Sequence, residues 1–198
     1  MIKVNTVVGG MVATNCYVVE NDKRECLVID IAEHTGGKIV EFIVGRGLTP
    51  LAILVTHGHF DHTLGITKFQ QSFPLEVYGN AADNGMKLRI FPKAYSFVTH
   101  DVADGELLAF GDFKVKVMHT PGHSAGSVCY LIEDCLFSGD TLFKGDIGRT
   151  DFEGGNVEQM AESLKKICAL EGDYKVYPGH MKSSTLDLER KNNRSLRF

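Results

Sequence analysis

Short apolar runs bounded by Gly, Pro, Asn or Asp recur along the chain. Runs of about four to eight residues that are rich in Val, Ile and Phe are typical of β-strands. We expect strands at residues 2–8, 15–20, 25–30, 51–55, 76–78, 106–110, 113–118, 128–132, 135–137 and 174–177. Asn21 and Asp22 mark a hairpin turn between the second and third of these runs.

Helical spacing of apolar residues predicts helices between some of these strands. In residues 36–46, Ile39, Val40 and Ile43 share one face, and Gly47 is a suitable C-terminal stop. Two further helices are expected through Ile66, Phe69 and Phe73 and, briefly, near residues 81–88.

An amphipathic helix is also expected to begin after Asn156, which can form a capping box with Gln159. Its apolar face consists of Val157, Met160, Ala161, Leu164 and Ile167. The order of all these elements predicts a mixed α/β fold in one domain over residues 1–198.

Charge and cysteine usage restrict the class of protein. The 21 Lys and Arg against 25 Asp and Glu leave no broad basic footprint for nucleic acid. We expect no signal segment, and no apolar run approaches the roughly 20 residues of a membrane span. We therefore expect a cytoplasmic protein that acts on a small molecule. The cysteines are expected to be free thiols, and they are Cys16, Cys26, Cys129, Cys135 and Cys168.

The densest group of candidate ligands directly follows the apolar run at 51–55. It consists of His57, His59, Asp61 and His62. Imidazole and carboxylate are preferred ligands of zinc and related metals. His57 and His59 point the same way in an extended turn, whereas Asp61 and His62 follow where a helix begins. The pattern predicts two neighbouring metal positions, and a solvated helix cap is the alternative interpretation.

Three more ligand-type residues, His123, Asp140 and His180, occur in similar settings. Each follows an apolar run that ends in Gly or Pro, which frees the backbone to aim a side chain outward. Several strand ends that each present such a residue favour a metal site over isolated caps.

The ordered set His-x-His-x-Asp-His, Pro-Gly-His, Gly-Asp and Gly-His resembles the metallo-β-lactamase superfamily of hydrolases. The resemblance runs from Asn15-Cys16-Tyr17 to His180 and implies a four-layer αββα sandwich with its ligands along one edge of the sheets. It implies a first metal held by His57, His59 and His123, a second held by Asp61, His62 and His180, and Asp140 as the bridging ligand.

Two segments of the chain are similar to the glyoxalase II-like branch of this superfamily. They are Gly139–Phe143 and Gly148–Phe152, and the tail from Ser184 to Asn193 is similar to small bacterial single-domain members. This branch hydrolyses thioesters such as S-acyl glutathione. Glyoxalase II itself adds a C-terminal helical region for glutathione, whereas this chain ends 18 residues beyond His180, so weak hydrolysis of such thioesters is expected.

We expect these ligands to hold two divalent ions, zinc or, as alternatives, iron or manganese. Such ions would make the site suitable for hydrolysis. Zinc lowers the pKa of bound water from about 15.7 to about 7, and Asp61 is expected to orient this water. Arg149 and Lys144 follow Asp140 in its loop and are expected to bind a substrate carboxylate. A solvated surface position is the alternative, more for Lys144 than for Arg149. Asp30, at a strand end, is expected either to accept a proton from a ligand imidazole or to be solvated.

Other functions stay open as alternatives. Persulfide dioxygenases share the fold and use one iron at positions that match His57, His123 and Asp140. They usually have Cys at the position of Ile147 and Ala at that of Gly179. β-Lactamases with two zincs commonly have Cys in place of Asp140. A non-catalytic module would use four closed ligands, usually including Cys. The physiological substrate, the metal and the oligomeric state stay undetermined.

Overall fold

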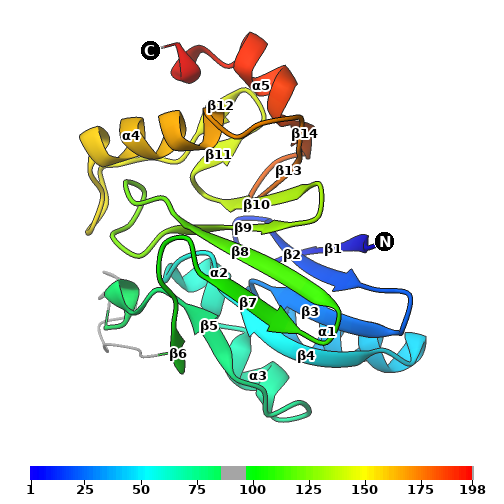
Figure 1. Cartoon of the computed structure of the whole chain (residues 1–198). Helices are drawn as coiled ribbons and strands as arrows, with labels where there is room; N and C mark the ends of the chain where they lie inside the picture. Colours follow the sequence, from blue (N-terminus) through cyan, green and yellow to red (C-terminus); the bar gives the residue numbers. More distant parts are fainter. Residues whose placement is uncertain (86–96, 198) are drawn as a thin grey trace.

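Two six-stranded β-sheets lie face to face in the middle of the molecule (Figure 1). This arrangement comes from a computed structural model that describes residues 1–85 and 97–197. The first sheet has the order β1 (Lys3–Gly9), β2 (Thr14–Glu20), β3 (Glu25–Ile29), β4 (Thr49–Leu54), β5 (Val77–Gly79) and β6 (His100–Asp101). The second has the order β14 (Ser184–Thr185), β13 (Lys175–Pro178), β10 (Cys135–Gly139), β9 (Val128–Ile132), β8 (Phe113–His119) and β7 (Leu107–Phe110).

Helices cover the outer face of each sheet. Apolar residues of α1 (Gly36–Arg46) and α3 (Ile66–Gln70) pack on the first sheet, and those of α4 (Val157–Cys168) and α5 (Leu186–Asn192) pack on the second. Figure 1 shows these two helix pairs on opposite sides of the sheets. The expected four-layer αββα sandwich is therefore confirmed.

Smaller elements complete the chain. They are the helical turns α2 (Phe60–Thr63), η1 (Ala81–Asp83) and η2 (Arg194–Leu196), and the hairpin of β11 (Leu142–Phe143) with β12 (Asp146–Ile147). None of the helices in the described ranges has the length and apolar character needed to cross a membrane. All five cysteines are free thiols, as expected.

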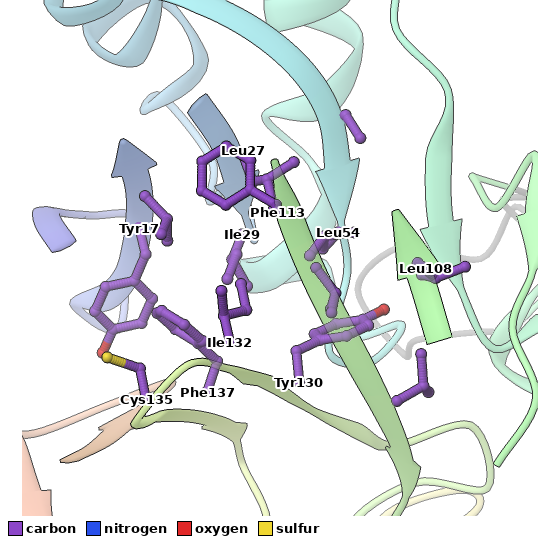
Figure 2. Close-up of a cluster of buried hydrophobic side chains, with 14 of the residues drawn as sticks. Tyr17, Leu27, Ile29, Leu54, Leu108, Phe113, Tyr130, Ile132, Cys135 and Phe137 are labelled. Atoms are coloured by element: carbon purple, nitrogen blue, oxygen red, sulfur yellow. The ribbon is translucent and has the colours of Figure 1, made fainter. Parts of the chain in front are cut away.

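The core between the two sheets is built from large side chains of both (Figure 2). Tyr17 of β2 packs edge-on against Phe137 of β10, with 5.4 Å between ring centroids. The buried tyrosines keep their hydroxyls paired across the sandwich: Tyr17 donates to Pro178 O (2.6 Å) and Tyr130 donates to Val55 O (2.9 Å). A buried hydroxyl needs such a partner, and these bonds connect the two sheets.

Strand direction decides where the loops meet. β3, β4 and β5 are parallel in the first sheet, and β10 is parallel to β13 in the second. β8 runs with β10 because both are antiparallel to β9. The segments that follow β3, β4, β8, β10 and β13 therefore gather at the same edge of the sandwich.

The expected strands all occur, with ends shifted by no more than two residues. The helix at residues 36–46 ends at Gly47 as expected, and Asn156 caps α4 by accepting the Gln159 N–H (2.8 Å). In a full capping box the Gln159 side chain would accept the Asn156 N–H, but this N–H donates instead to Gly122 O (2.8 Å).

The helix expected to begin near Asp61 and His62 and to continue through Ile66, Phe69 and Phe73 is not continuous. Gly65, whose N–H donates to Ile31 O (2.9 Å), separates α2 from α3, and α3 ends at Gln70, before Phe73. A Cβ at position 65 would overlap the backbone of the preceding loop, so tertiary packing sets this break. In place of the short helix expected near residues 81–88, the structure has the single turn η1, and residues 86–88 of the expected helix lie outside the described residues.

Candidate metal centre

The edge where the strands end brings together all seven predicted ligands. They are His57, His59, Asp61, His62, His123, Asp140 and His180, of which the first six are buried and His180 is half-buried. His57 and His59 follow β4, and Asp61 and His62 form the first turn of α2. The other three follow β8, β10 and β13. The two sheets thus contribute to one cluster.

The cluster divides into overlapping trios whose ligand atoms lie within 4.8 Å of one another. The trios are His57–His59–His123, His57–His62–Asp140 and Asp61–His62–His180. Asp140 lies between the first and the last, since its Oδ2 is 3.5 Å from His123 Nε2 and 3.4 Å from His180 Nε2. The arrangement provides two adjacent positions for cations with a carboxylate between them.

Several buried atoms of the cluster have no hydrogen-bond partner among the described residues. They are His57 Nε2, His59 Nε2, His62 Nε2 and Asp140 Oδ1. Buried polar atoms are rarely left unpaired in this way unless an ion or water completes them. Imidazole nitrogen and carboxylate oxygen are ligands that zinc, iron and manganese accept. The residues present therefore fit divalent cations.

The outer nitrogens of three imidazoles are held by fixed partners. His57 Nδ1 lies 3.1 Å from Thr56 Oγ1, His62 Nδ1 lies 2.7 Å from Asp30 Oδ2, and His123 Nδ1 lies 2.8 Å from Arg149 O. Such contacts set the orientation of a ligand ring and leave its other nitrogen for a metal.

Asp30 is the most constrained of these partners. It is 1% exposed and also accepts hydrogen bonds from the Thr56 N–H and Oγ1–H, both at 2.8 Å. Its φ of 55° is in the left-handed region, which Asp tolerates better than most residues. Of the two expectations for Asp30, the structure therefore supports contact with a ligand imidazole and excludes a solvated strand end.

Burial and charge prepare the ligands for a cation. Burial lowers the pKa of His57 well below its usual range and that of His59 to about 4, so both rings are neutral at pH 7. Burial raises the pKa of Asp140, but nearby imidazoles, chiefly His62, hold this pKa well below its usual range, so Asp140 is ionised. Metal ligation requires these protonation states.

The carboxylates have the opposite effect on two other histidines. Burial opposes protonation of His62, but Asp30, Asp140 and Asp61 hold its pKa well above the usual range. In the same way, hydrogen bonds to Asp140 and Asp61 outweigh burial and raise the pKa of His180 to about 9. The local excess of negative charge therefore favours positive charge at this position.

Two glycines make the close approach of the loops possible. Gly139 has φ 49°, in the left-handed region where glycine is unstrained, and it directs the following Asp140. A Cβ at Gly179 would overlap Asp140 Oδ1 and come within 2.6 Å of His62 Cε1. A side chain at position 179 would therefore disturb the contact between Asp140 and the third trio.

A cavity of about 530 Å³ opens above the cluster. Apart from five predicted ligands, the described residues that line it are Val12, Phe60, Phe143, Ile147, Arg149, Phe152 and Met181. Arg149 is thus at the site, but its guanidinium is bound by Asp151 through bonds of 2.6 and 2.7 Å. Lys144 does not line this cavity; it lies in an adjoining hollow with Tyr177 and Lys182.

Asp83 is part of the site that the sequence analysis missed. It is 1% exposed, and its Oδ2 accepts hydrogen bonds from the Gly58 N–H and Ser124 Oγ–H, both at 2.7 Å. Its Oδ1 accepts the Gly126 N–H (2.6 Å). Asp83 thereby joins the loop of His57 and His59 to the loop of His123. No local pattern marks it, because its partners lie far away in the sequence.

We expect Asp83→Asn to lower metal affinity about tenfold, the lower end of the range for residues that orient metal ligands. The amide offers one acceptor oxygen for three donors, so the two loops are held less firmly. Competition with a chromophoric chelator would measure the change. Asp101→Asn is the matched control, because Asp101 accepts the Ala81 N–H (2.7 Å) of the same η1 turn but contacts neither loop. Equal loss in both variants would contradict this role.

A sandwich that gathers histidines and aspartates from both sheets at one edge defines a class of metal-dependent, hydrolase-type enzymes. Residues 9–180 match the family model of the metallo-beta-lactamase superfamily. The chain belongs to this superfamily.

Curated relatives agree with this assignment. The chain is 36% identical over 198 residues to the probable metallo-hydrolase YqgX of Bacillus subtilis (strain 168), over 93% of this chain and 92% of that protein. It is 40% identical over 142 residues to a hydroxyacylglutathione hydrolase of Francisella philomiragia subsp. philomiragia. That match covers 71% of this chain but only 53% of the relative, so the chain spans about half of that protein.

Solved structures with the same fold carry different functional names. BLEG-1, a B3 metallo-beta-lactamase, has a TM-score of 0.89 and 33% identity, with full coverage of both chains. ETHE1 from Myxococcus xanthus has a TM-score of 0.85 and 26% identity over 97% of this chain and 83% of its own. TTHA1623, solved in a di-iron-bound form, has a TM-score of 0.83 and 32% identity over 96% and 98%. Because one fold supports several activities, function must be argued from the site.

Proposed function

We propose that the protein is a metal-dependent thioesterase that hydrolyses S-acyl glutathione or related thioesters in the cytoplasm. The observation that carries this proposal is the position of Asp140 between the trios His57–His59–His123 and Asp61–His62–His180. Such an arrangement suits two cations that share one carboxylate, and two adjacent cations can activate water for hydrolysis. We take zinc as the metal, with iron as the alternative that the di-iron form of TTHA1623 supports.

When bound, two divalent cations would lower the pKa of water and stabilise negative charge on a carbonyl oxygen. The chain itself supplies orientation and proton acceptance. Asp61 Oδ2 accepts a hydrogen bond from Thr14 Oγ1 (3.1 Å) and lies 3.2 Å from His180 Nε2, so its carboxylate is fixed at the cluster and can orient a water molecule. A thiolate leaving group needs no strong general acid, which favours a thioester over an amide.

A persulfide dioxygenase is the second candidate, because of the similarity to ETHE1 and the loop Gly148–Phe152. Gly179 weighs against it. The dioxygenases commonly have Ala there, and a Cβ at this position would displace Asp140 from its place near His62.

The open cavity above the cluster weighs against a non-catalytic module, because structural zinc sites are closed by four protein ligands.

We expect the purified protein to release thiol from S-acyl glutathione and to consume no oxygen with glutathione persulfide. A thiol-reactive dye and an oxygen electrode would measure the two reactions, and a chromogenic β-lactam would test the activity named for BLEG-1. Treatment with chelator should abolish thiol release, and added zinc should restore it. Oxygen uptake without thiol release would favour the dioxygenase, and β-lactam cleavage alone would favour a lactamase.

A further inference from the structure

Large apolar side chains surround the mouth of the cavity above the ligand cluster. Val12, Phe152 and Met181 are 51%, 47% and 56% exposed, and they come from three segments far apart in the sequence. Phe60, Phe143 and Ile147 line the same cavity. Single exposed apolar residues are common on protein surfaces, but a group gathered around a cavity marks a binding site.

Two of these residues make specific contacts, Met181 through its backbone and Phe152 through its ring. Met181 has φ 67°, an uncommon conformation for a residue with a side chain, and its carbonyl accepts a hydrogen bond from Asn15 Nδ2 (2.9 Å). The ring of Phe152 lies under the Arg149 guanidinium at 3.6 Å and meets His59 edge-on, with ring centroids 6.0 Å apart. Uncommon backbone geometry that is held by its surroundings is frequent at functional sites.

Outside the predicted ligands, the described wall of the cavity offers no free charged group to bind an anionic part of a substrate. Among the described residues that line it, Arg149 is the only Lys or Arg, and both of its bonds go to Asp151. A carboxylate of the ligand would have to displace this bidentate partner. The other lining residues, besides the predicted ligands, are apolar.

We propose that the acyl group of the substrate is apolar, an aliphatic chain or an aromatic ring, and that it binds against Phe143, Ile147, Phe152 and Met181. This inference rests on the proposed thioesterase function and specifies its substrate class. The cavity volume of about 530 Å³ is within the range of about 300–1,000 Å³ of small-molecule sites. The apolar wall adjoins the cluster, since Phe152 meets His59 and Phe143 meets His180, each with ring centroids 6.0 Å apart. An acyl group bound on this wall would therefore have its carbonyl close to the cluster.

Thioesters of one thiol carrier with acetyl, propanoyl, butyryl, hexanoyl and benzoyl groups would test this. We expect kcat/KM to rise along the aliphatic series by up to about fourfold per methylene, the factor that corresponds to burial of one CH₂. The lactoyl ester should react more slowly than the propanoyl ester, from which it differs by one hydroxyl. A flat series, or a preference for lactoyl over propanoyl, would overturn the inference while leaving the thioesterase function in place.

Met181→Ser and Phe152→Ser should each flatten the chain-length dependence without reducing metal content. Val44→Ser is the matched control, because Val44 is 65% exposed on α1, outside the cavity. A change in sedimentation of the Met181 or Phe152 variant with an unaltered chain-length dependence would identify an interface between copies instead and overturn the inference.

A binding measurement separates failure of the inference from failure of the proposed function. The S-hexyl thioether of the carrier cannot be hydrolysed, and calorimetry should show that it binds more tightly than the S-methyl thioether. Absence of hydrolysis for every thioester would overturn the proposed function. Equal binding of the two thioethers would overturn the apolar subsite.

Discussion

Replacing Asp140 with Ala should remove metal from the protein as well as activity. The carboxylate lies 3.4–3.5 Å from imidazole nitrogens of both outer trios, so its loss takes one negative charge from between two cation positions. Like charges at short range repel strongly where water is largely excluded, and Asp140 is buried. We expect the rate of hydrolysis to fall by more than about 100-fold, beyond the range for residues that only orient a ligand.

Elemental analysis of protein purified without chelator would measure this effect. The unaltered protein should approach two metals per chain, and Asp140→Ala should hold fewer. Arg149→Ala is the informative control, because only the backbone carbonyl of Arg149 contacts His123. This variant should keep both metals and change mainly KM, because the Arg149 guanidinium packs on Phe152 in the wall of the cavity. If Arg149→Ala lost the metals while Asp140→Ala kept them and stayed active, the assignment of the site would be wrong.

Gly179→Ala should leave the fold intact but convert the site to one metal per chain. No positive φ requires glycine here, so the effect comes from the Cβ, which would overlap Asp140 Oδ1 and approach His62 Cε1 to 2.6 Å. Movement of Asp140 away from His62 weakens the position formed by Asp61, His62 and His180. We expect a loss of hydrolysis of roughly 10- to 100-fold, as when the support of a metal ligand is disturbed.

Metal titration and thermal unfolding together would test this second effect. Gly45→Ala is the matched control, because a Cβ there meets no atom within 4 Å and the substitution lies on α1. That variant should keep two metals and gain up to about 1 kcal/mol of stability from its helix propensity. Two metals and full activity in Gly179→Ala would mean that the loops relax around the added methyl group.

The proteins that share this fold carry the names of a B3 lactamase, ETHE1 and a di-iron protein. The backbone of the sandwich therefore does not decide the reaction. In this chain, we propose that the reaction depends on the position of Asp140, the room left by Gly179 and the apolar wall of the cavity. Each can be changed by one substitution without altering the core between the sheets.

The sequence by itself determined the strands, the main helices and the candidate ligands. Side-chain direction along a strand repeats every two residues, and Gly and Pro end strands locally, so His57, His59 and Asp140 could be recognised from their neighbours alone. The four-layer sandwich came from the resemblance, because periodicity indicates only mixed α and β. The break at Gly65 was missed, since it arises from contact with the loop of Ile31.

Tertiary structure alone decided what surrounds the ligands. Asp83 bonds to loops 25 to 43 residues away, so its contacts need β4, β5 and the second sheet to be packed together. Asp30 meets His62 across 32 residues, and this contact needs the pairing of β3 with β4. Lys144 and Arg149 are close in sequence, yet Lys144, in the turn between β11 and β12, lies in a different hollow, and the Arg149 guanidinium is bound by Asp151. A local pattern specifies which atoms can bind a metal, whereas the shape and charge around them depend on contacts between distant segments.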